Sequence, residues 1–406
     1  MELKRYRLGE LGEVCMCKRI MKTETSEKGD IPFYKIGTFG DTPDVFIDRS
    51  LYEEYKNKYS FPKKGDVLIS AAGTIGRSVI YNGEDAYYQD SNIVWIDNDE
   101  SKVLNSYLFY IYKEIKWKIS TGSTILRLYN ENIRETEIIV PNLDVQKKIS
   151  DFLSLIDKKI ALNTRMNAEL ESMAKQLYDY WFVQFDFPDE NGNPYKSSGG
   201  KMVYNPTLKR EIPAGWYSSN ICIVAKILSG GTPSKAVNEY WENGNIPFFG
   251  PTDYEGNMYQ LRTALCITEK GLANCASSLF EEGDIIITAR GSIGKLVIVG
   301  TPMAMNQSCY ALRSIEKQHE YLYFLTIQLI EYLKLKGNGS VFKSIIASDI
   351  EDSILCIAKS DIIEKYCNLV KPMFLQIKKN IEENISFIYL RDSLLPMLMN
   401  GQVTVE

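Results

Sequence analysis

Residues 65–77 of this 406-residue chain read GDVLISAAGTIGR, and residues 283–295 read GDIIITARGSIGK. Each stretch is a short apolar run that leads into a glycine-rich turn and ends on a cation. Adding 218 converts residues of the first stretch and its neighbourhood into their counterparts: Gly65, Asp66, Gly73, Gly76 and Gln89 become Gly283, Asp284, Gly291, Gly294 and Gln307. With other offsets, IPFYKIGTFGD at 31–41 matches IPFFGPTDYEG at 246–256, and GSTILRLYNENI at 122–133 matches GSVFKSIIASDI at 339–350. The sequence therefore predicts one duplicated unit of about two hundred residues.

Each half has the same internal order. Short β-branched runs, separated by Gly, Pro and Asp, are followed by one aromatic-rich helical segment and then by a long helix. This order predicts an α+β fold with two similar globular domains. We place the domains at 1–143 and 216–359, the long helices at 144–184 and 360–406, and a Gly-, Pro-, Asn- and Ser-rich connector at 185–215.

The two long helices share a heptad pattern. The first stripe runs through Ile149, Leu153, Ile156, Ile160, Asn163, Asn167, Leu170, Ala174, Leu177 and Trp181. Adding 217 gives the second: Tyr366, Val370, Met373, Ile377, Asn380, Asn384, Phe387, Arg391, Leu394 and Leu398. Both stripes carry Asn at the same two positions, which predicts an antiparallel coiled coil whose register is fixed by Asn163, Asn167, Asn380 and Asn384. Alternatively, these Asn side chains lie on the flank of a broader apolar face and point to water.

The composition narrows the chemistry. His319 is the single histidine, and the eight cysteines are scattered without the spacing of a metal site, so nucleophile–histidine catalysis and multi-histidine metal binding are disfavoured. The charged N-terminus lacks the apolar core of a signal peptide, and we expect a cytoplasmic protein with unpaired thiols. The net charge of −5 argues weakly against nucleic-acid binding, but cations cluster locally, so a basic face remains compatible with the sequence.

The glycine turns do not fit a phosphate-binding P-loop. That motif requires a glycine and a hydroxyl residue where the second copy has Ala289 and Leu296. Two interpretations remain. The turns connect strands and use glycine for positive φ, or they also face a nucleic-acid backbone through Thr74, Arg77, Arg290, Ser292 and Lys295. Asp66 and Asp284 are interpreted as turn-forming residues and not as metal ligands.

A second candidate contact region follows the aromatic-rich helical segment. In the first half it contains Ser123, Thr124 and Arg127, and in the second half Ser340 and Lys343. Hydroxyl and cationic side chains are typical phosphate contacts, so these residues could bind DNA. The same stretch is equally compatible with a helix end and a surface loop.

Several motifs occur in a specific order: the glycine phrases, EIPAGW at 211–216, GGTPSK at 230–235, MNQSCYAL around Gln307 and LRDSLLPMLMNGQV at the end of the second helix. In this respect the chain resembles the specificity subunit of type I restriction-modification systems. The resemblance implies that each domain reads one half of a bipartite DNA site and that the coiled coil acts as a spacer. It further implies docking of two methyltransferase subunits and, in some systems, of restriction and translocase subunits. S-adenosylmethionine and ATP would bind only to those partners, and this chain would hold no metal and catalyse no reaction.

The resemblance also points to individual contact residues. In the second domain these are Thr232, Ser234, Lys235 and Gln307. The first domain has CMCKRIMKTE where the second has the GGTPSK turn, so Lys18 and Arg19 are its candidate counterparts. This difference predicts that the two domains read different sequences. Two other functions remain as alternatives: a coiled-coil scaffold whose globular ends bind proteins, and an enzyme in its own right.

Overall fold

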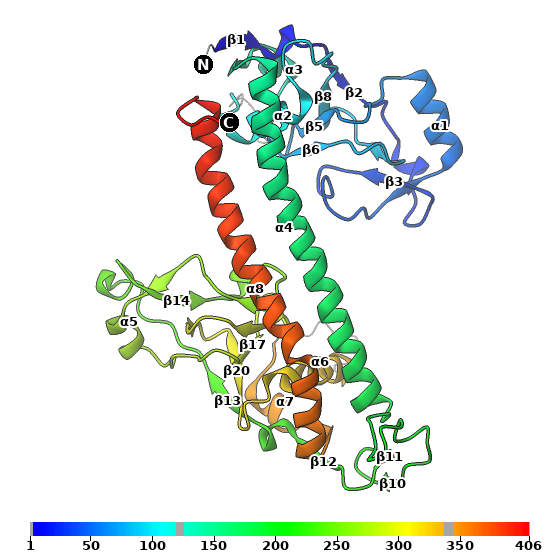
Figure 1. Cartoon of the computed structure of the whole chain (residues 1–406), viewed down its shortest axis with the longest axis vertical. Coiled ribbons are helices and arrows are strands. Elements are labelled where there is room, and N and C mark those ends of the chain that lie inside the picture. Colours follow the sequence, from blue (N-terminus) through cyan, green and yellow to red (C-terminus); the bar gives the residue numbers. More distant parts are fainter. Residues whose placement is uncertain (1–2, 119–125, 337–343, 406) are drawn as a thin grey trace. The chain divides into compact units, whose positions relative to one another are not determined.

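The computed structural model describes residues 3–118, 126–336 and 344–405 (Figure 1). The candidate residues Ser123, Thr124, Ser340 and Lys343 lie outside the described residues. The chain divides into two compact units. Unit 1 comprises residues 1–159 and 386–406, and unit 2 comprises residues 160–385. Helices α4 (Leu143–Tyr178) and α8 (Ser360–Met399) are each divided between the units, with one segment in unit 1 and the other in unit 2.

Unit 1 is built on three small sheets. Its main sheet has the antiparallel order β2-β8-β5-β6, its second sheet has the order β4-β3-β7, and β1 pairs with β9. The strands are β1 (Lys4–Arg7), β2 (Val14–Met16), β3 (Ile31–Tyr34), β4 (Phe46–Ile47), β5 (Val67–Ser70), β6 (Ser78–Ile80), β7 (Tyr87–Tyr88), β8 (Ile93–Ile96) and β9 (Glu137–Val140). The short helices are α1 (Arg49–Lys58), α2 (Asn105–Glu114) and α3 (Asn130–Glu135).

Unit 2 repeats this topology. Its main sheet has the order β13-β20-β17-β18-β15, its second sheet has the order β16-β14-β19, and β12 pairs with β21. The strands are β12 (Tyr217–Asn220), β13 (Ala225–Ser229), β14 (Ile246–Phe249), β15 (Tyr259–Gln260), β16 (Cys266–Ile267), β17 (Ile285–Thr288), β18 (Leu296–Val299), β19 (Ala304–Met305), β20 (Cys309–Ser314) and β21 (Ile354–Ile357). The short helices are α5 (Glu269–Ala273), α6 (His319–Lys336) and α7 (Ala347–Glu351). Apart from the added strand β15 and a separate hairpin at 202–213, the sheet orders match, which confirms the predicted duplication.

The predicted connector is a folded part of unit 2. It contains the hairpin of β10 (Met202–Asn205) and β11 (Arg210–Pro213). Phe187 is buried and stacks between Tyr195, at 4.6 Å between ring centroids, and Trp216, at 5.2 Å. Aromatic side chains thus join this segment to the main hydrophobic cluster of unit 2, which its Gly- and Pro-rich composition conceals.

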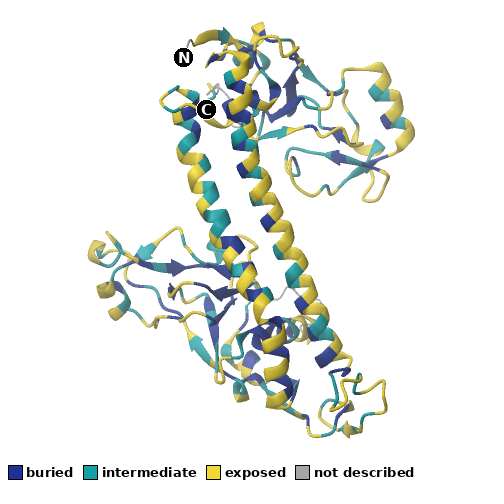
Figure 2. Cartoon of the chain, in the orientation of Figure 1, coloured by how far each residue is buried: buried dark blue, intermediate teal, exposed yellow. Residues whose placement is uncertain are grey.

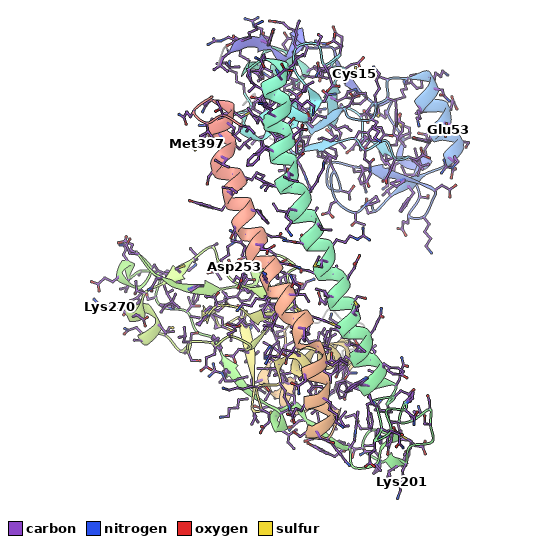
Figure 3. The ribbon with its side chains drawn as sticks, in the orientation of Figure 1. Cys15, Glu53, Lys201, Asp253, Lys270 and Met397 are labelled. Atoms are coloured by element: carbon purple, nitrogen blue, oxygen red, sulfur yellow. The ribbon has the colours of Figure 1, made fainter. Side chains whose placement is uncertain are left out.

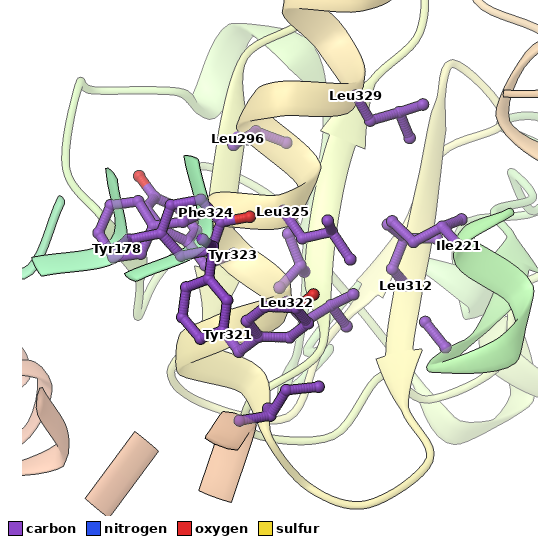
Figure 4. Close-up of a cluster of buried hydrophobic side chains, with 14 of the residues drawn as sticks. Tyr178, Ile221, Leu296, Leu312, Tyr321, Leu322, Tyr323, Phe324, Leu325 and Leu329 are labelled. Carbon is purple, nitrogen blue, oxygen red and sulfur yellow. The ribbon is translucent and has the colours of Figure 1, made fainter. Parts of the chain in front are cut away.

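The apolar runs form buried strands, as Figure 2 shows for the main sheets. In unit 1 the helix α2 and the ends of α4 and α8 pack together, with Ile149, Leu153 and Leu398 in one cluster. In unit 2 the corresponding core is more aromatic. Figure 4 shows Tyr178 of α4 beside Phe324 of α6, and their ring centroids are 5.5 Å apart.

Helix α4 continues into a π-helical turn (Asp179–Val183) and so ends close to the predicted residue 184, whereas α8 ends at Met399, seven residues before the predicted end at 406. All twenty residues of the two predicted heptad stripes are buried or half-buried. Helix α8 contains Pro372 and Pro396 and continues through both. Within the described ranges, no helix is both long and apolar enough to cross a membrane.

The four Asn residues meet across the helix pair of unit 2. Asn163 Nδ2 donates to Asn384 Oδ1 at 3.0 Å, and Asn380 Nδ2 donates to Asn167 Oδ1 at 2.8 Å. Asn163 and Asn380 are buried, so the alternative in which these side chains point to water does not hold for them. A shift along the helix would break both cross-helix amide bonds, so these pairs favour the observed register.

The glycine phrases form the turns between β5 and β6 and between β17 and β18, which confirms the strand-to-strand interpretation. Gly73 and Gly76 have φ values of +65° and +83°, and Gly291 and Gly294 have +78° and +76°. In each turn a strand-end hydroxyl accepts from the main chain seven residues on: Arg77 N donates to Ser70 Oγ at 2.9 Å, and Lys295 N donates to Thr288 Oγ1 at 2.9 Å.

Substitution of Gly76 by Ala is expected to destabilise unit 1 by about 1–3 kcal/mol. A Cβ at this position would lie 2.4 Å from Nε1 of Trp117 and would sit on a left-handed backbone. The free energy of unfolding in urea measures the effect. Gly65→Ala is the matched control, because Gly65 also has positive φ but has no atom within 4 Å of an added Cβ. Equal losses for both variants would show that the contact with Trp117 is unimportant.

Candidate nucleic-acid interface

The strand registers define which loop residues are equivalent in the two units. Two rows of paired residues cross the main sheets: Ile69, Val94 and Met16 in unit 1, and Ile287, Tyr310 and Ser229 in unit 2. Arg19 lies three residues after Met16, and Thr232 lies three residues after Ser229. The structure therefore places Arg19 at the position of Thr232, as the sequence comparison of the two loops suggested.

The alignment of Gln89 with Gln307 is wrong. Tyr88 of β7 pairs with Tyr34 of β3, and Met305 of β19 pairs with Phe249 of β14, so Tyr88 and Met305 are equivalent. The residues that follow them are then equivalent too: Gln89 corresponds to Asn306, and Asp90 corresponds to Gln307. Gln89 N and Asn306 N make the same main-chain bond, each at 2.9 Å, to the partner strand. The error arises because unit 1 has one residue more between β6 and β7: six residues separate Ile80 from Tyr87, whereas five separate the equivalent Ile298 from Ala304.

The equivalent positions make equivalent contacts with different chemistry. In unit 1, Arg19 Nε donates to Asp90 Oδ2 at 3.0 Å. In unit 2, the hydroxyl of Thr232 donates to Oε1 of Gln307. The same two loops are thus joined by an ion pair in one domain and by a neutral hydrogen bond in the other. This difference places two opposite charges in unit 1 where unit 2 has two neutral groups.

In unit 2, main-chain hydrogen bonds bring the predicted loops together. Gly231 N donates to Met305 O at 3.0 Å, and Ala289 N donates to Ser308 O at 2.8 Å. The glycine turn, the 230–235 loop and the 306–308 loop are therefore neighbours. Their outward side chains are exposed or, for Thr232, half-buried: Thr232, Ser234, Lys235, Arg290, Ser292, Lys295 and Gln307.

A fourth loop, residues 250–254, borders this group. The ammonium of Lys295 lies 5.5 Å from the ring centroid of Tyr254. Asp253, labelled in Figure 3, holds the loop by accepting from Gly250 N at 2.8 Å and from Ala264 N at 2.9 Å. Sequence reasoning missed Tyr254, because no local pattern connects it with a turn forty residues later.

In unit 1 the same loops meet, but more of their cations are engaged. Arg77 Nη2 donates to Gly40 O at 3.3 Å, and Arg127 Nη2 donates to Ser91 O at 2.8 Å. Arg127 is half-buried and holds the loop that contains Ser91. The exposed Lys18 lies over the ring of Tyr59 at 5.1 Å, and Thr74 is exposed at the glycine turn.

The acids of the glycine phrases form turns, as predicted. Asp66 Oδ2 accepts from Lys63 N at 2.7 Å, and Asp284 Oδ2 accepts from Glu281 N at 2.8 Å. Burial raises the pKa of the Asp66 carboxyl. Asp284 also accepts from Arg313 Nη2 at 2.6 Å. Both carboxylates are occupied within their domains and buried, which suits a structural role.

Among the described residues, no group of three or more His, Cys, Asp or Glu side chains could hold a metal ion. All eight cysteines are free. His319 lies 3.4 Å from a carboxylate oxygen of its neighbour Glu320. The exposed groups that the structure gathers are hydroxyls, amides, guanidinium and ammonium groups, which bind anions and base edges and do not form a nucleophile–base arrangement.

Two α+β domains of one topology, each presenting a cluster of polar loops and each packed on a pair of long antiparallel helices, define a duplicated recognition protein. The family model of the type I restriction modification DNA specificity domain matches residues 2–172 and 213–390. The chain therefore belongs to this family.

Named relatives agree with this assignment. A putative type I restriction enzyme specificity subunit of Haemophilus influenzae is 53% identical over 177 residues, which cover 43% of this chain and 45% of that protein. The MjaIX specificity subunit of Methanocaldococcus jannaschii is 29% identical over 402 residues, 93% of this chain and 88% of the relative. The crystal structure of a type I restriction-modification S subunit from M. genitalium has the same fold, with a TM-score of 0.60 at 15% identity over 98% of this chain and 96% of that one.

Proposed function

We propose that this chain is the sequence-reading subunit of a type I restriction-modification complex and that each of its domains reads one half of a bipartite DNA site. One observation carries the proposal: the same arrangement of polar loops occurs at equivalent positions of both domains, with different side chains. Arg19 and Asp90 in unit 1 correspond to Thr232 and Gln307 in unit 2. Two similar frames with different surfaces suit two half-sites of different sequence.

The chemistry of the loops supports DNA as the ligand. Lysine, arginine, serine and threonine contact phosphates and set the position of a protein on the duplex, whereas other loop side chains read base edges in the major groove. In unit 2, Lys235, Arg290 and Lys295 supply cations on neighbouring exposed loops. The negative net charge of the whole chain does not oppose this, because the field at a surface depends on its local charges.

The duplication also supports the proposed partners. Two equivalent helix-and-domain surfaces would dock two methyltransferase subunits, one for each DNA strand, and restriction and translocase subunits would join in a complete system. S-adenosylmethionine and ATP would bind to those partners, and this chain would itself be non-catalytic. We place the complex in the cytoplasm, where its DNA is found and where free cysteines are stable.

Charge removal at the loops of unit 2 tests the function. Arg290→Gln and Lys295→Gln, each assembled with the methyltransferase partner, are expected to weaken DNA binding about tenfold at moderate salt. Each is also expected to lower the slope of log affinity against log salt by about 1. Lys270→Gln is the control, because Lys270 lies on α5 and already pairs with Glu239 at 3.0 Å (Figure 3).

The same measurements separate the alternatives. A protein-binding scaffold would show no salt-dependent association with DNA even when its partners are present. An enzyme would transfer methyl groups or cleave DNA as the purified chain alone. Unchanged affinity and salt slope in both charge variants would remove the glycine turn of unit 2 from the DNA interface.

A further inference from the structure

The Asn pairs fix the register of the two long helices but do not determine which helix pairs with which. Asn163 bonds with Asn384, and Asn380 bonds with Asn167. Subtracting 217 converts Asn384 into Asn167 and Asn380 into Asn163. If α4 met α4 of a second copy in the same antiparallel register, Asn163 would face the other copy's Asn167, and equivalent hydrogen bonds would form. The duplication thus creates a competing pair, α4 with α4 of a second copy, in which the Asn residues would also be hydrogen-bonded.

One seam position makes the helices differ in charge. Arg391 is the single charged residue in the two heptad stripes. Its Nη1 lies 2.7 Å from Asp157 Oδ1, and the two side chains are 20% and 28% exposed. Tyr110 Oη donates to the other carboxylate oxygen of Asp157 at 2.8 Å, and Lys113 Nζ lies 3.9 Å from it. On its own helix, Arg391 also contacts Asp392 at 2.8 Å. All these residues belong to unit 1.

The equivalent positions in unit 2 are apolar. Subtracting 217 from Arg391 gives Ala174, and adding 217 to Asp157 gives Phe374. Ala174 is fully buried and Phe374 is 1% exposed, and both belong to one hydrophobic cluster. The native pairing of α4 with α8 therefore matches charge with charge in unit 1 and apolar with apolar in unit 2.

Exchange between copies would break both matches. Pairing α4 with α4 would place Asp157 against the other copy's Ala174, and pairing α8 with α8 would place Arg391 against Phe374. A half-buried charge that loses its partner is strongly disfavoured. We infer that the Asp157–Arg391 ion pair selects the pairing of α4 with α8 within one chain and rejects pairing of the duplicated helices between two copies. This inference does not depend on DNA binding.

Charge reversal tests the selection. Asp157→Arg places two guanidinium groups together within the chain, and Arg391→Asp places two carboxylates together; helix exchange relieves either repulsion. Two differently tagged copies of each full-length variant are unfolded, mixed and refolded, and the mixed-tag complex is quantified by tandem affinity capture and sedimentation. Each single variant is expected to raise the mixed-tag fraction about tenfold over the native chain. The double variant Asp157→Arg/Arg391→Asp restores the ion pair and is expected to return to the native value.

A second variant removes the selection without creating repulsion. Asp157→Phe/Arg391→Ala gives unit 1 the apolar pair of unit 2, so native and exchanged helix pairs no longer differ in charge at this position. Mixed-tag complexes are expected to rise with protein concentration, because the ion pair then no longer adds to the effective concentration of the tethered helices. Arg165→Gln is the control, since Arg165 is exposed and pairs with Glu169 on the same helix.

Two results would overturn the inference. One is a folded single variant, judged by circular dichroism, that forms no more mixed-tag complex than the native chain. The other is a charge-swapped double variant that exchanges as much as the single variants. If a single variant does not fold, Asp157→Phe/Arg391→Ala alone tests the inference. If that variant stays monomeric at all concentrations, another feature selects the pairing.

Discussion

Replacement of residues 1–142 by the corresponding segment of a relative is expected to change one half of the methylated DNA motif and to leave the other half unchanged. The exchanged segment contains all of the loops that unit 1 contributes to the candidate interface, including Arg19, Thr74, Arg77 and Arg127. It also contains the whole second hydrophobic cluster of unit 1, around Phe33 and Trp95, so the reading surface and its support move together.

The junction of this exchange follows the packing. The main cluster of unit 1 continues into α4 and α8 through Ile149, Leu153, Leu395 and Leu398. A donor segment must therefore present an apolar surface of similar volume to these residues, or the unit will be destabilised by cavities or overpacking. Sequencing of methylated bases in a host that carries the hybrid gives the new motif.

The reciprocal exchange of residues 216–359 is the matched control. It is expected to change the other half-site only. A hybrid that methylates the original motif, or a motif altered in both halves, would contradict independent reading by the two domains. Loss of all methylation with normal folding would instead indicate that the graft disturbed assembly with the partners, which co-purification of the methyltransferase subunit detects.

Much of the fold could be predicted from the sequence because duplication makes local patterns visible twice. Gly73 and Gly76 recur as Gly291 and Gly294, and the positive φ of all four explains why glycine is required in both copies. The heptad stripes were predictable for a similar reason. A seam position must be apolar or paired in both helices, so the pattern survives where the individual side chains differ.

The arrangement of the candidate site was less predictable, because it depends on register and on long-range contacts. One extra residue between β6 and β7 of unit 1 shifts the alignment, so Gln307 corresponds to Asp90 and not to Gln89. Arg127 carries a typical phosphate-binding group, yet its guanidinium donates to Ser91 O within the domain. Composition gives no indication of either fact, since both follow from how strands distant in sequence pair.

Insertion of seven residues into both long helices is expected to lengthen the unread gap of the DNA site by about three base pairs. Seven helical residues add about 10 Å, and one base pair rises by about 3.4 Å. The insertions belong between residues 159 and 160 and between residues 385 and 386, where the two units divide. There they leave the Asp157–Arg391 contact in unit 1 and the Asn163–Asn384 contact in unit 2 intact.

A full heptad keeps the apolar stripes in phase, whereas three base pairs turn the second half-site by about a third of a DNA turn. Methylation is therefore expected to be slower, and the length of the gap is the decisive measurement. Insertion into α4 alone serves as the control, because the contacts of both units cannot then form along one continuous α8, and the thermal stability is expected to fall. The gap could instead stay unchanged while both half-sites are still methylated. The two domains would then reach their half-sites independently of helix length, and the helices would not set the spacing.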